Sequence, residues 1–421
     1  MKSVLIFSKQ HFGNVSLAAE HVRAHGLRSV LVSELPDNRH RDTCDDHVVF
    51  DWYSEDLPAL TARLEQRGIA PVAVVNMLES LTPWQIALAT HYDIPGAEEG
   101  RRVLLSKVLV RERMKALGLS GIRFSGDPAT VDFFPSIVKP STDSGASYLV
   151  SRVDSPDELL AYRRRLDEAG FADTELIVEE YLPGIEFSVD GPVVDGRFHP
   201  ILAVEKPEHD HVRHHDAGLE FHPPEQDCVR EGVRLLCEQV NTLCAELRLD
   251  QFWLHFEGRS TEHGRTELIE INTRPGGGMI PAAVREISGI DPIGAYVSMA
   301  LGEFTLDEPI PFRDRPIVGW IDMEGDELGT VEVSTTEDDL RALPGVIGAQ
   351  ITNGYRITDL ERENFFLRFA VTADSVSQLR DRVETVRNKV DYRITADPDA
   401  PLAQPDREVS EIHSDSRQKS T

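Results

Sequence analysis

The chain has 421 residues, of which 40 % are hydrophobic, and carries a formal net charge of −28. This length allows two or three domains with a substantial buried core. The acidic balance argues against general nucleic-acid binding, which needs basic residues to neutralise phosphates, and no apolar run approaches the ~20 residues of a membrane helix. The start, MKSVLIFSKQ, has too short an apolar segment for a signal peptide, so we expect a cytoplasmic protein.

Residues 1–100 alternate between strand-like and helix-like segments. Strands are predicted at 3–7, 29–32, 47–50 and 71–76, and helices at 15–25, 57–67 and 82–91. This order is typical of a parallel sheet that helices cover on both faces. No G-x-G-x-x-G motif follows the first strand and no P-loop motif occurs in the chain, so neither of these nucleotide sites is predicted.

Two lysines follow in different settings. Lys107 falls inside a helix predicted over residues 103–117, where a solvated lysine is the ordinary interpretation. Lys139 ends a short strand and precedes a loop of small and hydroxyl residues at 141–147. The N–H groups of such a loop can lie against phosphate oxygens. Loops of this composition are usually only turns, so the segment does not define a site by itself.

A segment rich in histidine lies between the predicted strands at 176–180 and 186–190 and a long helix at 225–247. Its histidines are His199, His209, His211, His214, His215 and His222. Clustered histidines suggest zinc, but no paired-ligand spacing recurs, and a solvated loop is the favoured interpretation. The four cysteines of the chain form no C-x-x-C pair, and disulfides are not predicted.

Two acidic strands form the most informative part of the chain. Residues 252–257 and 268–272 alternate apolar and polar side chains, and turn residues at 258–265 separate them. An antiparallel pair would bring Glu257 beside Glu270, with Asn272 on the same face and Ile269 and Ile271 in the apolar layer behind. Carboxylate and amide oxygens suit magnesium. A lone Glu-x-Asn is more often a solvated strand face, so it is the combination that favours a site.

Arg274 and three glycines follow this strand. Arg274 offers a planar fork that fits a carboxylate or phosphate, and the glycines let the backbone approach a ligand closely. The alternative is a glycine turn beside an ordinary salt bridge.

Beyond the glycines, a helix is predicted at 289–301. Strands at 317–320 and 365–371 with a helix at 375–389 suggest a small α+β lobe. Residues 397–421 have the composition of a disordered tail.

Taken in order, these parts resemble the ATP-grasp superfamily over residues 1–305. The similarity rests on Lys107, on Ile-Val-Lys139-Pro, on Glu179-Glu180-Tyr181-Leu182 before Gly184-Ile185-Glu186, and on Glu257 with Glu270-Ile-Asn272-Thr-Arg274. The resemblance implies an α/β and α+β protein. It would have an N-terminal parallel-sheet domain at 1–100, a two-lobed nucleotide-binding core at 101–305 with a lid lobe at about 125–185, and a small C-terminal lobe at 306–396.

The resemblance also implies roles for individual residues. Lys107 and Lys139 would contact the phosphates of ATP, and Ser144, Gly145, Ala146 and Ser147 would close over them. The segment Glu179, Glu180, Tyr181 and Leu182 would hold the adenine, and Glu186 the ribose. Glu257, Glu270 and Asn272 would ligate two Mg²⁺ ions, which Mn²⁺ could replace. Arg274, Gly277 and Gly278 would face the transferred phosphate or the substrate carboxylate.

The implied reaction joins a carboxylate to an amine through an acyl phosphate. Asn272-Thr-Arg-Pro-Gly-Gly-Gly-Met-Ile is most similar to the bacterial L-amino acid ligases, which make dipeptides. The substrates would be two amino acids or an amino acid and a small amine, and the protein could be a homodimer. Three alternatives stay open: a biotin-carboxylase-like enzyme, a purine-biosynthesis type of ATP-grasp enzyme, and a catalytically silent nucleotide-binding protein.

Overall fold

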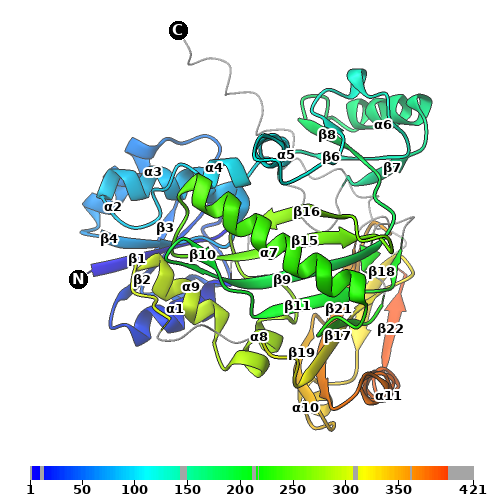
Figure 1. The fold of residues 1–421 in the computed structure, drawn as a ribbon. Coiled ribbons are helices and arrows are strands. Elements are labelled where there is room, and N and C mark those ends of the chain that lie inside the picture. Colours follow the sequence, from blue (N-terminus) through cyan, green and yellow to red (C-terminus); the bar gives the residue numbers. More distant parts are fainter. Residues whose placement is uncertain are drawn as a thin grey trace.

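The computed structural model describes residues 2–9, 14–142, 149–210, 215–216, 218–306, 312–360 and 363–396. The predicted tail at 397–421 lies outside the described residues, as do Ser144, Gly145, Ala146 and Ser147 of the predicted phosphate loop and His211 and His214. Figure 1 shows a long central sheet, with the N-terminal domain at one end, a small lobe above it and the C-terminal strands at the other end. Among the described helices, none has the length and apolar character needed to cross a bilayer.

The N-terminal domain is a parallel sheet in the order β3-β2-β1-β4. Side chains of β1 alternate between two apolar clusters, because Val4 and Ile6 pack on one face and Leu5 and Phe7 on the other. The predicted parallel sheet is therefore confirmed. Its elements are β1 (Lys2–Phe7), α1 (Val15–Ala24), β2 (Arg28–Ser33), η1 (Arg41–Thr43), β3 (Asp46–Val49), α2 (Leu57–Gln66), β4 (Ala70–Val75), η2 (Glu79–Leu81) and α3 (Thr82–Tyr92).

The helix predicted over residues 103–117 is wrong as a single helix. The chain forms α4 (Arg101–Leu104) and α5 (Lys107–Ala116) instead. Ser106 has an extended backbone, and its side chain accepts a hydrogen bond from the N–H of Leu109, so it caps α5. Lys107 is consequently the first residue of a helix, and its own N–H donates to the carbonyl of Ser141, 2.8 Å away.

The small lobe is an antiparallel sheet in the order β5-β8-β6-β7. One face packs on α6 through Val138, Tyr162, Leu166 and Val178. Because side chains alternate along a strand, Lys139 and Glu179 point to the opposite face. The elements are β5 (Phe124–Ser125), η3 (Pro128–Thr130), β6 (Ser136–Pro140), β7 (Ser151–Val153), α6 (Pro156–Glu168) and β8 (Leu176–Glu180).

A nine-stranded sheet forms the centre of the molecule, with the path β16-β15-β9-β11-β14-β17-β21-β19 and β10 paired to β9. Its first part and the helices on it are β9 (Ile185–Val194), β10 (Arg197–Phe198), β11 (Leu202–Lys206), β14 (Glu220–His222), α7 (Asp227–Leu247), β15 (Phe252–Ser260), β16 (Thr266–Asn272), α8 (Ile280–Ser288) and α9 (Pro292–Ala300). The short strands β12 (His209–Asp210) and β13 (His215–Asp216) form a separate pair.

The C-terminal lobe shares this central sheet, because β14 pairs with β17 and β17 pairs with β21. A second sheet, β20-β18-β22, completes the lobe. The elements are β17 (Ile317–Glu324), β18 (Gly329–Val333), α10 (Glu337–Arg341), β19 (Val346–Ile351), β20 (Tyr355–Ile357), β21 (Phe365–Ala373), α11 (Val376–Arg387) and β22 (Tyr392–Thr395). The sequence predicted a small α+β lobe but not its continuity with the central sheet.

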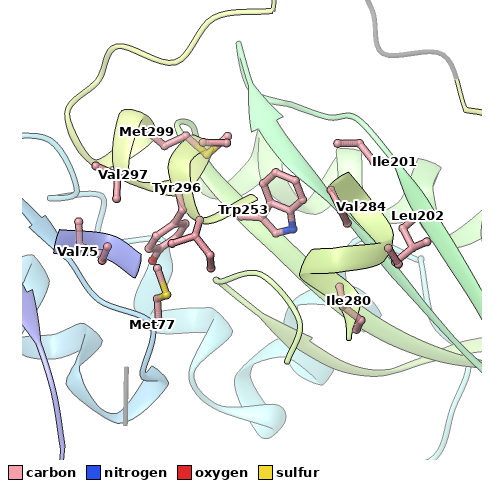
Figure 2. Packing of buried hydrophobic residues seen from close by; sticks show 14 of the residues in the cluster. Val75, Met77, Ile201, Leu202, Trp253, Ile280, Val284, Tyr296, Val297 and Met299 are labelled. Carbon is pink, nitrogen blue, oxygen red and sulfur yellow. The ribbon is translucent and has the colours of Figure 1, made fainter. Parts of the chain in front are cut away.

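Helices cover both faces of the central sheet. On one face, Leu236 of α7 packs in a cluster with Phe252 and Phe256 of β15, and Figure 1 shows α7 lying across these strands. On the other face, Trp253 packs with residues of α8 and α9. Figure 2 shows that Val75 and Met77 of the N-terminal domain join this second cluster. The N-terminal domain is thereby packed against the face of the central sheet that carries α8 and α9.

The hairpin of β15 and β16 has the predicted register, with Glu257 directly opposite Glu270. A bulge then shifts the pairing, because the next residue of β15, Gly258, is opposite Leu268. Ile269 is the extra residue. Leu268 and Ile271 therefore enter the apolar cluster, and the prediction that Ile269 does so is wrong. Ile269 instead borders the cavity described below.

Candidate active site

A cavity of about 550 Å³ opens between the small lobe, the central sheet, the N-terminal domain and the C-terminal lobe. Every predicted site residue that lies in the described part of the chain borders it. They are Lys107, Lys139, Glu179, Glu180, Tyr181, Leu182, Glu186, Glu257, Glu270, Asn272, Arg274, Gly277 and Gly278. The fold thus brings together residues that are up to about 170 positions apart in the sequence.

Two lysines neutralise the paired carboxylates of the hairpin. Lys107 Nζ lies 2.9 Å from Glu270 Oε1, and Lys206 Nζ lies 2.8 Å from Glu257 Oε1. Carboxylates directly opposite each other on paired strands repel, so this arrangement requires cations. Burial alone would raise the pKa of Glu257, but Lys206 and His255 outweigh it and hold that pKa well below 4.5.

The same residues form a donor set that fits magnesium. Glu257 and Glu270 supply carboxylate oxygens, and Asn272, opposite His255 on the hairpin, supplies an amide oxygen. The part of the chain that the structure describes contains no group of three or more His, Cys, Asp or Glu side chains able to hold a metal. His222 in particular hydrogen-bonds the backbone oxygens of Ala203 and Arg313 and is buried.

Asp190, which the sequence did not single out, connects the glycine loop to β15. Its carboxylate is fully buried and accepts hydrogen bonds from the Gly276 N–H at 2.9 Å and the Trp253 indole at 3.2 Å. Its other oxygen lies 2.7 Å from His255 Nδ1. Burial would lower the pKa of His255, but Asp190 and Glu257 raise it to about 10, so the ring is cationic at neutral pH.

Gly276 is required by this anchor. A Cβ at this position would lie 2.5 Å from Ile280 Cδ1 and 2.8 Å from His255 Nδ1. A larger residue would therefore have to displace the Ile280 side chain and the buried imidazole. The network fixes where the backbone of residues 276–278 passes along the cavity.

Lys139 belongs to a buried ion-pair network rather than projecting alone. Its Nζ lies 2.8 Å from Glu179 Oε2 and donates to the carbonyl of Ile269 at 3.2 Å. Arg111 of α5 pairs with the other oxygen of Glu179. Burial would raise the pKa of Glu179, but the two cations lower it from 4.5 to about 2. The Glu179 side chain is thus committed to holding Lys139 at the cavity.

This network gives a prediction about acid stability. The pKa of Glu179 is depressed in the folded state, so its stabilising contribution is complete above the unfolded pKa near 4.5 and is lost as the pH falls toward about 2. We expect Glu179→Gln to lower the free energy of unfolding at pH 7 by about 3 kcal/mol. We also expect a shallower loss of stability between pH 4.5 and 2. Urea unfolding across this range measures both effects.

Glu246→Gln is the matched control, because Glu246 pairs with Arg113 of the same helix at 3.1 Å but is 43 % exposed. Its effect should be at most about 1 kcal/mol and should be screened by salt. Equal acid sensitivity in wild type and Glu179→Gln would show that the buried network does not control acid unfolding.

The segment predicted to hold adenine runs along the edge of the small lobe. The N–H groups of Glu180 and Tyr181 already donate to the carbonyls of Arg123 and Pro135. Glu180 is paired with Arg265 at 2.9 Å. Any backbone contact with a base would therefore have to come from the remaining groups of residues 179–182.

Glu186, predicted for the ribose, is nearly buried and has two cationic neighbours. Its carboxylate lies 3.4 Å from Lys206 Nζ and 3.1 Å from Arg259 Nε. Lys206 therefore stands between Glu186 and Glu257 and connects the predicted ribose and metal positions. A signal for Lys206 was present in the sequence, as a polar residue ending the apolar strand 202–206.

Arg274 is held by the N-terminal domain. Its Nε lies 2.6 Å from Glu79 Oε1, on the short helix η2 after β4. Its Nη1 donates to the carbonyl of Pro275 at 3.2 Å. The salt bridge predicted as the alternative for Arg274 therefore exists, with Glu79 as the partner. Both residues border the cavity, as do Gly277 and Gly278.

Residues 132–282 match the family model of the ATP-grasp domain. This part of the chain is therefore similar to ATP-grasp domains. The match covers both acidic strands, Lys139, Arg274 and the glycine loop, and it indicates an ATP-dependent ligase, for which ATP and Mg²⁺ are the usual cofactors. No curated protein gave a significant match to the chain.

Solved structures with an ATP-grasp architecture resemble the whole chain. An L-amino acid ligase from Bacillus licheniformis has a TM-score of 0.75 and 16 % identity, over 94 % of this chain and 99 % of its own. The biotin carboxylase domain of a Hydrogenobacter thermophilus 2-oxoglutarate carboxylase, in complex with MgADP, has a TM-score of 0.70 and 15 % identity. The match covers 93 % of this chain and 90 % of that domain. N5-carboxyaminoimidazole ribonucleotide synthetase from Thermotoga maritima has a TM-score of 0.66 and 14 % identity. The match covers 94 % of this chain and 99 % of the synthetase. At these identities the comparisons show the fold.

Proposed function

We propose that the protein is an ATP-dependent carboxylate–amine ligase that joins two amino acids, or an amino acid and a small amine. One observation carries the proposal. The cavity brings the carboxylates of Glu257 and Glu270 together with Lys107, Lys139 and the guanidinium of Arg274. This is an array for positioning a polyphosphate beside a carboxylate, and no protein nucleophile is needed for the reaction.

The chemistry has two steps. A substrate carboxylate oxygen attacks the γ-phosphorus of ATP, giving an acyl phosphate and ADP. The amine then attacks the acyl carbon, phosphate leaves, and the amine loses a proton to give the amide. Both steps build negative charge on oxygens, so fixed cations and N–H donors accelerate them.

The residues of the chain take separate parts in this scheme. Lys107 and Lys139 would bind phosphate oxygens, and Arg274 would hold the carboxylate that is activated. The N–H groups of residues 276–278, fixed through Asp190, would face the transferred phosphate. Glu257, Glu270 and Asn272 would hold two Mg²⁺ ions, whose contribution when bound is to neutralise phosphate charge.

A two-stage assay tests the proposal. Thermal shift with ATP and Mg²⁺ first establishes nucleotide binding, and a phosphate-release screen over pairs of amino acids then tests ligase activity. Hydroxylamine in place of the amine would trap an acyl phosphate as a hydroxamate. ATP binding without phosphate release or hydroxamate for any carboxylate would instead support a catalytically silent nucleotide-binding protein. The predicted homodimer stays a prediction, which analytical ultracentrifugation would test.

Lys139→Ala should affect the nucleotide and not the choice of amino acid. We expect the apparent KM for ATP to rise roughly 10- to 100-fold, since a hydrogen bond to a charged group contributes about 1.5–3 kcal/mol. The increase should be the same with different amino acids. Lys115→Ala, at an exposed position near the end of α5, is the control. An effect that varied strongly with the amino acid would place Lys139 in the substrate pocket.

A further inference from the structure

The C-terminal lobe supplies one wall of the cavity. Asp322 of β17 lies directly opposite Arg368 of β21 in the central sheet. Residues of the intervening positions, Ile321, Leu367 and Phe369, pack into the core of the C-terminal lobe. The opposite face of these strands contributes Trp320 to the central cluster and places Asp322 and Arg368 at the cavity.

The guanidinium of Arg368 is oriented by three neighbours. Its Nε lies 3.1 Å from Asp322 Oδ2, and its plane lies over the Phe365 ring, 4.7 Å from the centroid. A Cβ at Gly278 would lie 3.4 Å from Nη1, so this end of the fork is directed at the glycine loop. The side chains of Arg368 and Asp322 are 27 % and 12 % exposed, respectively. Nε is thus engaged by Asp322, while Nη1 lies beside residues predicted to face the reacting groups.

Two guanidinium groups therefore border the same cavity, and each is tied to a different domain. Arg274 is tied to Glu79 of the N-terminal domain, and Arg368 is tied to Asp322 of the C-terminal lobe. A ligase of this kind has to hold two substrates, and only one of them is the carboxylate that becomes phosphorylated. A guanidinium fork suits a carboxylate.

Building on the proposed function, we propose that Arg368 binds the carboxylate of the amine substrate. The amine substrate is accordingly of the amino-acid class, with a carboxylate of its own, and not a simple amine. Asp322 is a positioning residue that orients the fork of Arg368.

The test compares three acceptors for the acyl group: the best amino acid from the phosphate-release screen, its carboxamide, and hydroxylamine. We expect the wild-type protein to use the amino acid roughly 10- to 100-fold better than the carboxamide, as measured by kcat/KM. Arg368→Gln should remove most of this preference by lowering kcat/KM for the amino acid alone. Rates with the carboxamide and hydroxylamine should change little.

Two further variants sharpen the result. Asp322→Asn should reduce the same preference by a smaller factor, since it only loosens the fork. Arg380→Gln is the control, because Arg380 lies on α11 and is 52 % exposed. If Arg368→Gln fails to fold in a thermal-shift assay, Arg368→Lys keeps the charge without the fork and should show the same selective loss.

Three outcomes overturn the inference. They are an equal loss with all three acceptors, a wild-type protein that does not distinguish the amino acid from its carboxamide, and an Arg368→Gln variant that keeps the preference. The first would place Arg368 at acyl-phosphate formation. Failure of the proposed function is separate, because then the wild-type protein would form no hydroxamate from any carboxylate.

Discussion

We expect Glu270→Gln to lower the rate of ATP-dependent phosphate release by roughly 100-fold or more, which corresponds to about 2.7 kcal/mol in the transition state. The substitution keeps the shape of the side chain but removes the charge opposite Glu257 on the hairpin. It also leaves Lys107, 2.9 Å from Glu270 Oε1, without its carboxylate. The loss of charge at the proposed metal position should therefore lower the rate of the chemical step and change how that rate depends on Mg²⁺ concentration.

The measurement is phosphate release across a Mg²⁺ titration with the best substrate pair. Glu262→Gln, in the exposed turn of the same hairpin, is the control. A rate near that of wild type at every Mg²⁺ concentration would exclude Glu270 as a metal ligand. If the rate were low at limiting Mg²⁺ and returned to that of wild type at excess Mg²⁺, Glu270 would contribute to affinity for the ion and not to the transition state.

We expect Arg274→Lys to lower kcat/KM for the acyl-donor amino acid by roughly 100-fold, although the charge is conserved. Arginine contacts Glu79 through Nε and the Pro275 carbonyl through Nη1. A lysine has a single nitrogen, so it cannot keep both contacts and also present a fork to a carboxylate. The affinity for ATP with Mg²⁺ should stay close to that of wild type.

Calorimetric titration with ATP and Mg²⁺, together with steady-state kinetics, separates the two sites. The control is Arg285→Lys on α8, whose side chain is 54 % exposed and pairs with Asp291. If ATP affinity fell in parallel with activity, Arg274 would belong to the nucleotide site. The activated carboxylate would then need another partner.

The acidic hairpin could be read from the sequence because its signals are local. Alternation along residues 252–257 and 266–272 and the short turn between them fix which side chains share a face. The bulge at Ile269 could not be read, because an extra residue in one strand depends on its pairing partner. The break before Lys107 was missed for a related reason. The apolar pattern continues across it, while Ser106, with an extended backbone, caps the N-terminus of a new helix at Lys107.

The residues that support the site carried weaker signals. Asp190 lies within an apolar strand and gains its partners His255 and Gly276 only when β9 pairs with β15. Glu79 and Arg368 come from outside the matched domain and reach the cavity through domain packing. Sequence patterns report periodicity along one element, so contacts between distant domains are not visible in them.

The pairing of β14 with β17 limits how the C-terminal lobe can be removed from this chain or exchanged for that of another protein. A protein ended before residue 306 would leave β14 as an open sheet edge, with the N–H and C=O groups that now bond β17 turned to solvent. Such edges template association between chains. Exchange of C-terminal segments among proteins of this shape would therefore have to preserve the β14–β17 register, from Glu220 opposite Trp320 to His222 opposite Val318. The catalytic core and the C-terminal lobe would have to be inherited as one hydrogen-bonded unit.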